Sequence, residues 1–132
     1  GREGRTIRGM FEMVDLLPTL GDLAGIPLNP HFAGRSFARD LLASTEECGR
    51  EDVYAYHGDG DIMLQSESFK YITHYSNEKR SEVLYDLQKD PDEFFNIASD
   101  PAYVGTLQSL RERAFDRTVH ASRSIQDIRT RF

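Results

Sequence analysis

Residues 84–98 read Leu84-Tyr85-Asp86-Leu87-Gln88-Lys89-Asp90-Pro91-Asp92-Glu93-Phe94-Phe95-Asn96-Ile97-Ala98. The alternation of side chains from Val83 to Leu87 predicts a strand packed on at least one face. Asp90-Pro91 predicts the end of this strand, because proline cannot donate to a β-ladder and disfavours helix at the residue before it. The Asp90 and Asn96 side chains can accept from backbone N–H groups two residues on, which predicts a turn and a fixed loop.

Two residues at the end of this predicted strand have structural interpretations. We expect Tyr85 to be a core anchor whose hydroxyl reaches a backbone acceptor, rather than a catalytic phenol. We expect Asp86 to hold the turn in place with its carboxylate.

Three more strands are predicted upstream, and the segments that separate them are short and rich in glycine, serine, asparagine and charged residues. Such short connections favour an antiparallel meander over crossover connections. The four predicted strands lie near residues 52–56, 61–66, 69–75 and 82–87.

A short helix is predicted from Asp15 to Gly25. Asp15 is a suitable N-cap, Pro18 is tolerated in the first turn, and Gly25 suits the left-handed residue that ends a helix. The apolar residues at helical spacing are Leu16, Leu17, Leu20, Leu23 and Ala24.

The longest predicted helix begins after Asp100-Pro101, and a separate short helix is predicted within residues 120–132. A helical turn is also expected around Phe37–Leu42. These elements predict an α+β fold, with a small antiparallel sheet of about four strands packed against a long C-terminal helix and preceded by a short N-terminal helix.

Composition excludes several classes of protein. The 132 residues carry a formal net charge of −6, and no basic cluster could neutralise a row of phosphates, so nucleic acid is not an expected partner. No apolar run approaches the ~18 residues of a membrane span. The single cysteine, Cys48, excludes an internal disulfide, so cysteine usage assigns no compartment.

Four blocks of this sequence resemble the type I sulfatases of the alkaline phosphatase superfamily. Residues 84–98 are similar to the family's C-terminal signature L-Y-D-L-x-x-D-P-x-E-x-x-N-x-A, and residues 15–27 to its D-L-x-P-T-L-x-x-L-A-G-I-P segment. Gly34-Arg35-Ser36-Phe37 with the following Leu41-Leu42 resembles G-x-S-L…L-L, and residues 69–72 resemble Y-K-Y-I with Phe in the first place. The likeness covers roughly residues 13–115 in the family's order.

The resemblance implies a sulfate ester hydrolase that uses calcium and a formylglycine made from the Cys or Ser of a C/S-x-P-x-R motif. In the family these groups lie N-terminal to the segment that residues 15–27 resemble. Cys48 is followed by Gly49-Arg50 and lacks the Pro and the correctly spaced Arg. We therefore expect the C-terminal portion of a sulfatase with no catalytic or metal-binding residue of its own, and a missing N-terminal catalytic domain as its partner.

The same resemblance suggests a division of the chain. Residues 1–45 would form the end of the catalytic domain, and residues 46–132 the C-terminal subdomain. Outside that domain, the apolar face of the first helix would drive self-association, or the chain would be partly disordered before about residue 45. This face consists of Leu16, Leu17, Leu20 and Leu23.

Three residues are candidates for the rim of the substrate cleft. His57 and Asp59 lie in a glycine-rich segment whose simpler interpretation is a hairpin, and Lys70 has the simpler interpretation of a solvent-facing strand lysine. The resemblance implies that loops of the small subdomain border the cleft, so these residues could touch the substrate. Two other functions stay open, namely part of a related phosphodiesterase or phosphonate hydrolase, and a non-catalytic binding module.

Overall fold

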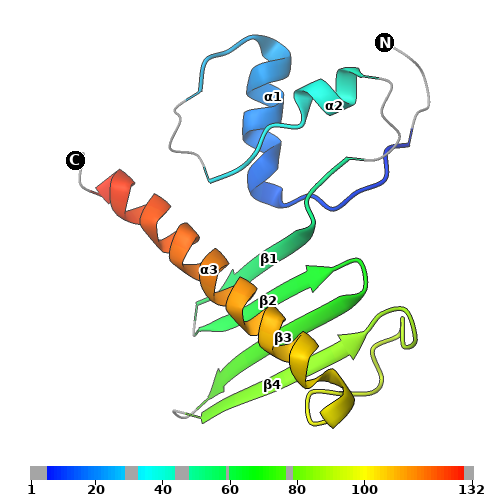
Figure 1. Ribbon diagram of the computed structural model, residues 1–132. Helices are drawn as coiled ribbons and strands as arrows, with labels where there is room; N and C mark the ends of the chain where they lie inside the picture. Colours follow the sequence, from blue (N-terminus) through cyan, green and yellow to red (C-terminus); the bar gives the residue numbers. More distant parts are fainter. Residues whose placement is uncertain (1–5, 29–32, 44–47, 59, 77–78, 130–132) are drawn as a thin grey trace. The chain divides into compact units, whose positions relative to one another are not determined.

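A computed structural model of the protein describes residues 6–28, 33–43, 48–58, 60–76 and 79–129 (Figure 1). The chain divides into two compact units. One unit consists of Gly1–Glu51 with Ala121–Phe132, and the other of Asp52–His120.

The second unit contains a four-stranded antiparallel sheet with the strand order β1-β2-β3-β4, which confirms the predicted meander. Its strands are β1 (Asp52–His57), β2 (Asp61–Ser66), β3 (Phe69–Ser76) and β4 (Lys79–Asp86). β4 begins three residues earlier than predicted, because its polar first residues still pair with β3 through Ser76 and Lys79. Backbone pairing does not require apolar side chains, so the apolar pattern of the sequence could not predict where this strand begins.

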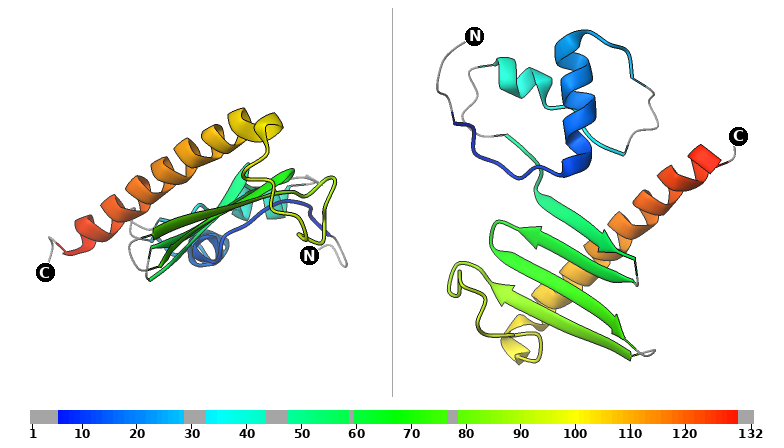
Figure 2. Two further views of the ribbon diagram at one scale, coloured as in Figure 1. Left: turned by 90° about the horizontal axis from the view of Figure 1, so that it is seen from below. Right: turned by 180° about the vertical axis from the view of Figure 1, so that it is seen from behind.

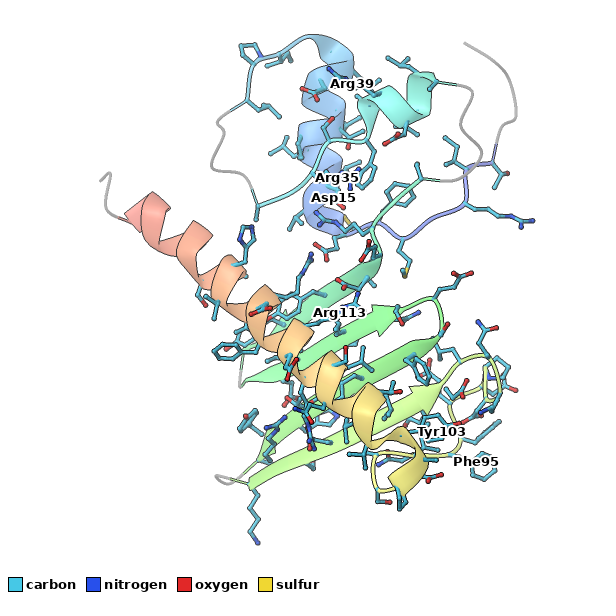
Figure 3. All side chains as sticks on the ribbon, viewed as in Figure 1. Asp15, Arg35, Arg39, Phe95, Tyr103 and Arg113 are labelled. Carbon is cyan, nitrogen blue, oxygen red and sulfur yellow. The ribbon has the colours of Figure 1, made fainter. Side chains whose placement is uncertain are left out.

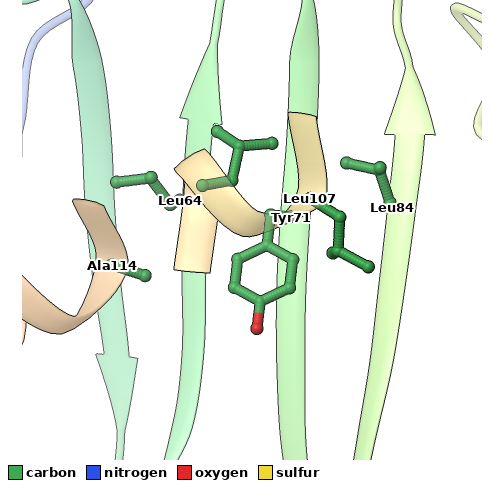
Figure 4. Close-up of a cluster of buried hydrophobic side chains, with 6 residues drawn as sticks. Leu64, Tyr71, Leu84, Leu107 and Ala114 are labelled. Carbon is green, nitrogen blue, oxygen red and sulfur yellow. The ribbon is translucent and has the colours of Figure 1, made fainter. Parts of the chain in front are cut away.

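The core of this unit lies between the sheet and helix α3 (Figures 2 and 4). Leu64, Tyr71 and Leu84 are opposite one another on the three strands β2, β3 and β4, and all three are fully buried. α3 covers them with Leu107, Leu110 and Ala114. Burial of each large apolar side chain stabilises the fold by roughly 1.5–3 kcal/mol.

Tyr85 does not have the predicted core position. Successive side chains of a strand point to opposite faces, so Tyr85 lies on the face away from buried Leu84 and is half-buried. Tyr71 on β3 is the buried aromatic residue instead.

The C-terminal helix is longer than predicted. A 3-10 turn, Pro101–Tyr103, leads into α3 (Val104–Arg129), and the Asp100 side chain caps the turn by accepting from Ala102 N at 2.9 Å. The predicted separate helix within residues 120–132 is wrong, because α3 continues to Arg129. No proline or glycine interrupts the sequence after Gly105, so nothing stops the helix earlier.

The first unit contains α1 (Leu16–Ala24) and α2 (Ala38–Leu42), which confirms both predicted helical segments. A 3-10 turn, Met13–Asp15, precedes α1. Gly25 ends α1 in the left-handed conformation at φ 67°, and Ile26 N donates to Gly21 O at 2.9 Å. The leucines of α1 are 42–53% exposed in this unit, namely Leu16, Leu17, Leu20 and Leu23.

Asp15 does not cap α1 with its side chain. It is 3% exposed, and its carboxylate accepts from the backbone N–H of Glu12 at 2.9 Å and of Arg35 at 2.8 Å. The Arg50 guanidinium completes the cluster by pairing with both carboxylate oxygens. Figure 3 shows Asp15 at the start of α1. Asp15 therefore holds together three segments of this unit that are distant in sequence.

Replacing Gly25 and Gly105 by alanine should change the stability of their helices in opposite directions. A methyl carbon at either Gly25 or Gly105 would meet no atom of the described residues within 4 Å, but only Gly25 has a positive φ. Gly25→Ala is expected to destabilise α1 by about 1 kcal/mol, and Gly105→Ala to stabilise α3 by about 0.5–1 kcal/mol. Urea unfolding followed by circular dichroism measures both, and shifts of the same sign would contradict this account.

Candidate functional site

The loop that follows β4 is fixed by side chains of the signature stretch. The Asp86 carboxylate accepts from the backbone N–H groups of Gln88 and Lys89, both at 3.2 Å, and from the Tyr103 hydroxyl at 3.0 Å. The prediction that Asp86 holds the turn is confirmed. Asp90 accepts from Phe94 N at 3.1 Å and from Phe95 N at 2.8 Å, which lie four and five residues on rather than two.

Asn96 brings this loop back along the free edge of the sheet. Its Oδ1 accepts from Leu84 N and Ala98 N, both at 3.0 Å, and its Nδ2 donates to Glu82 O at 3.1 Å. Ile97 N also donates to Leu84 O at 2.9 Å. β4 is an edge strand, so the loop occupies backbone groups that would otherwise be open to pairing with another chain.

Asn96→Ala should lower the free energy of unfolding by about 1–2 kcal/mol, because backbone groups on both sides of the loop lose their partner. Urea unfolding measures this loss. An unchanged free energy of unfolding in Asn96→Ala would show that these three hydrogen bonds contribute little.

Lys70 lies on β3 and is paired with this loop. Its Nζ donates to both carboxylate oxygens of Glu93 at 2.9 Å, and the lysine side chain is 23% exposed. Lys70 is therefore a half-buried ion-pair partner rather than a solvent-facing strand lysine. Next to Glu93, whose φ is 60°, the loop exposes two aromatic side chains, Phe94 at 75% and Phe95 at 71%. Figure 3 labels Phe95 on this loop.

The structure does not bring the predicted rim residues together. His57 is exposed at the end of β1, where its partner on the neighbouring strand β2 is Asp61. The β2 partner of Lys70 is Gln65. These two positions on β2, Asp61 and Gln65, are four steps apart, which is about 13 Å along the strand. Asp59, the third predicted rim residue, lies outside the described residues.

One histidine has an acidic partner that lies thirteen residues away in sequence. His74 Nδ1 lies 3.0 Å from Asp61 Oδ2, and Asp61 Oδ1 accepts from Tyr75 N at 2.9 Å. The hydrogen bond with His74 lowers the pKa of the Asp61 carboxyl. Within the described part of the chain, no three His, Cys, Asp or Glu side chains are grouped so that they could hold a metal ion.

Comparison with known proteins identifies the family to which this chain belongs. Residues 2–120 match the family described as N-sulphoglucosamine sulphohydrolase, C-terminal. The chain belongs to this family of sulfatase C-terminal domains, which confirms the resemblance to type I sulfatases. No helix in the described ranges is both long and apolar enough to cross a membrane.

Individual relatives are also sulfatases or related hydrolases. The chain is 37% identical over 124 residues to a delta 4,5-hexuronate-2-O-sulfatase of Bacteroides thetaiotaomicron, covering 89% of this chain and 25% of that protein. The structure of a 2-O GAG sulfatase matches with a TM-score of 0.67 and 35% identity, over 88% of this chain and 26% of that one.

A phosphonate monoester hydrolase of Agrobacterium radiobacter has a similar structure, with a TM-score of 0.64 and 25% identity, over 80% of this chain and 24% of that one. The chain thus spans about a quarter of the length of the relatives it matches.

Proposed function

We propose that this chain completes the fold of a sulfatase whose catalytic domain precedes it, and that it contributes no catalytic residue itself. Membership of the sulfatase C-terminal family carries the proposal. The calcium ion and the formylglycine nucleophile would both belong to the larger part. Residues 1–45 would be the end of the catalytic domain, and residues 46–132 the C-terminal subdomain.

Two apolar surfaces support docking against a larger domain. In the sheet unit, the face away from α3 carries half-buried apolar side chains, namely Val53, Met63, Ile72, Val83 and Tyr85. In the first unit, the four leucines of α1 are about half exposed. Apolar surfaces of this kind mark interaction sites in soluble proteins.

The exposed leucines of α1 predict how the chain behaves when the catalytic domain is absent. Without the catalytic domain, we expect self-association through Leu16, Leu17, Leu20 and Leu23, because association removes these side chains from water. Light scattering over a range of concentrations measures this, and Leu16→Glu with Leu20→Glu should restore a monomer. A concentration-independent monomer of the unchanged chain would contradict the prediction.

His57, Asp59 and Lys70 are proposed to border the substrate cleft of the complete protein. The ion pair with Glu93 fixes the Lys70 ammonium at the sheet surface and partly neutralises it. Lys70 would therefore act on the organic part or a peripheral group of the substrate. In a protein that includes the catalytic domain, Lys70→Ala should raise KM more than it lowers kcat, with Lys79→Ala as a charge-matched control.

The single test of the main proposal compares two proteins on 4-nitrophenyl sulfate with calcium present. The 132-residue chain should show no turnover, and the protein extended through the catalytic domain should hydrolyse the ester. Calcium-dependent hydrolysis by the 132-residue chain alone would overturn the proposal.

A second candidate function is hydrolysis of a phosphonate or phosphodiester, which the likeness to the Agrobacterium radiobacter hydrolase supports. A phenylphosphonate monoester assayed beside 4-nitrophenyl sulfate distinguishes the two. A larger kcat/KM for the phosphonate would favour this second function.

A further inference from the structure

A pocket of about 320 Å³ lies in the sheet unit. Beyond the buried row of Leu64, Tyr71 and Leu84, the same face of the sheet continues with polar and aromatic side chains. The pocket is lined by Ile62, Tyr71, Thr73, Tyr75, Arg80, Arg111, Ala114, Phe115 and Thr118. Its volume is at the lower end of the range for small-molecule sites.

The polar wall of the pocket has a net positive charge. The Glu82 carboxylate accepts from the Tyr71 hydroxyl at 2.5 Å, from Arg80 Nη2 at 2.6 Å and from Arg111 Nε at 2.8 Å. Two guanidinium groups thus face one carboxylate. Within the described part of the chain, Arg80 makes hydrogen bonds through Nη2 alone. Its Nε and Nη1 donors are therefore available to an anion.

A buried hydroxyl in the same pocket lacks a partner. Thr73 is 4% exposed, and its Oγ1 makes no hydrogen bond with any described residue. Thr73 is opposite both Ile62 and Glu82 in the sheet, which fixes its position in the pocket wall. An unpaired buried hydroxyl destabilises the fold, and a bound acceptor oxygen would remove that cost.

The rest of the lining is apolar or aromatic and suits a compact organic body. Ile62 and Ala114 contribute aliphatic surface, and Phe115 is 67% exposed although it is a large apolar side chain. Tyr75 adds a second aromatic ring beside Arg80, its partner in the sheet. A ring-shaped ligand would cover these side chains and remove them from water.

We propose that this pocket binds a small organic oxyanion, a carboxylate or sulfate carried on a six-membered ring. The acidic group would accept from Arg80 and from the Thr73 hydroxyl, and the ring would lie against Ile62 and Phe115. The proposal does not depend on the function proposed above, because all the lining residues belong to the sheet unit of this chain.

The 132-residue chain, labelled for amide NMR, tests this by titration with D-glucuronate, benzoate, inorganic sulfate and methyl glucoside. We expect D-glucuronate or benzoate to shift the amides of residues 73, 75 and 80 and to saturate. Inorganic sulfate should bind at least several-fold more weakly, and the uncharged methyl glucoside should not bind at this site. Absence of saturable shifts with both ring acids would overturn the proposal, as would equal binding of methyl glucoside.

Variants give the sharper test. Thr73→Val keeps the shape of the side chain and removes the hydroxyl, so it should leave stability unchanged or higher and weaken binding about tenfold. Arg80→Gln should also weaken binding, whereas Lys79→Gln, the same charge change next to it on β4, should have less than a twofold effect. Unchanged affinity in Thr73→Val, or equal losses in Arg80→Gln and Lys79→Gln, would show that the pocket is not the binding site.

Discussion

Glu82→Gln is expected to lower the free energy of unfolding by about 3 kcal/mol at neutral pH. The hydrogen bonds from Arg111 hold the pKa of the Glu82 carboxyl at about 2, helped by Tyr71 and Arg80 and opposed by burial. The ordinary pKa of a glutamate carboxyl is 4.5, and a pKa difference of this size corresponds to about 3 kcal/mol of folding stability. Glutamine removes the charge and leaves the two arginines without their shared carboxylate.

The same pKa shift predicts how stability depends on pH. The folded pKa of Glu82 is below its ordinary value, so its contribution is fully present above about pH 4.5 and is lost as the pH falls towards about 2. Urea unfolding between pH 7 and pH 2 should show a smaller loss for Glu82→Gln than for the unchanged protein. Glu112→Gln on the exposed side of α3 is the control and should change little. Parallel pH profiles of the unchanged protein and Glu82→Gln would contradict the assignment.

Asp15→Asn is expected to loosen the first unit by a similar amount, about 3 kcal/mol, because the half-buried Arg50 loses its paired carboxylate oxygens and keeps the longer contact with Glu12 at 3.6 Å. Burial acts to raise the pKa of the Asp15 carboxyl, but the hydrogen bonds from Arg50 and from the backbone of Arg35 and Glu12 lower it overall. The carboxylate is thus the form that the fold stabilises.

Amide hydrogen exchange measures this loss locally. In Asp15→Asn the Glu12 and Arg35 amides, which donate to Asp15, should exchange about 100-fold faster. Asp22→Asn on the exposed side of α1 changes the same charge and should leave those amides protected. Unchanged protection in Asp15→Asn would mean that Arg50 contributes little to this cluster.

Local signals in the sequence were enough to predict most of the elements. Gly25 ends α1 because a left-handed residue is needed there, and short polar turns between β-type segments predict the antiparallel meander. The errors at the start of β4 and in α3 have the same cause. In both elements the backbone hydrogen bonding continues through residues whose side chains no longer follow the apolar pattern, so the pattern gave the wrong boundary.

Contacts between distant parts of the chain could not be predicted from spacing. Asp15 resembled a helix cap because only its neighbours were visible, whereas its partner Arg50 is 35 residues away. Lys70 resembled an exposed strand lysine because Glu93, 23 residues on, lies in a loop with no regular period. The roles of His57 and Lys70 at a cleft stay predictions, since they come from family resemblance.

The hydrogen bonds of the loop after β4 have a consequence for gene surveys. Asp86, Asp90 and Asn96 all direct their side chains to backbone groups of their own loop and strand. These three residues fix the architecture of the loop, and hydrolases of different esters, such as sulfate and phosphonate esters, can share that architecture. A survey that searches with this string alone should therefore collect hydrolases of more than one ester chemistry, and sorting them requires the residues around the reacting atom.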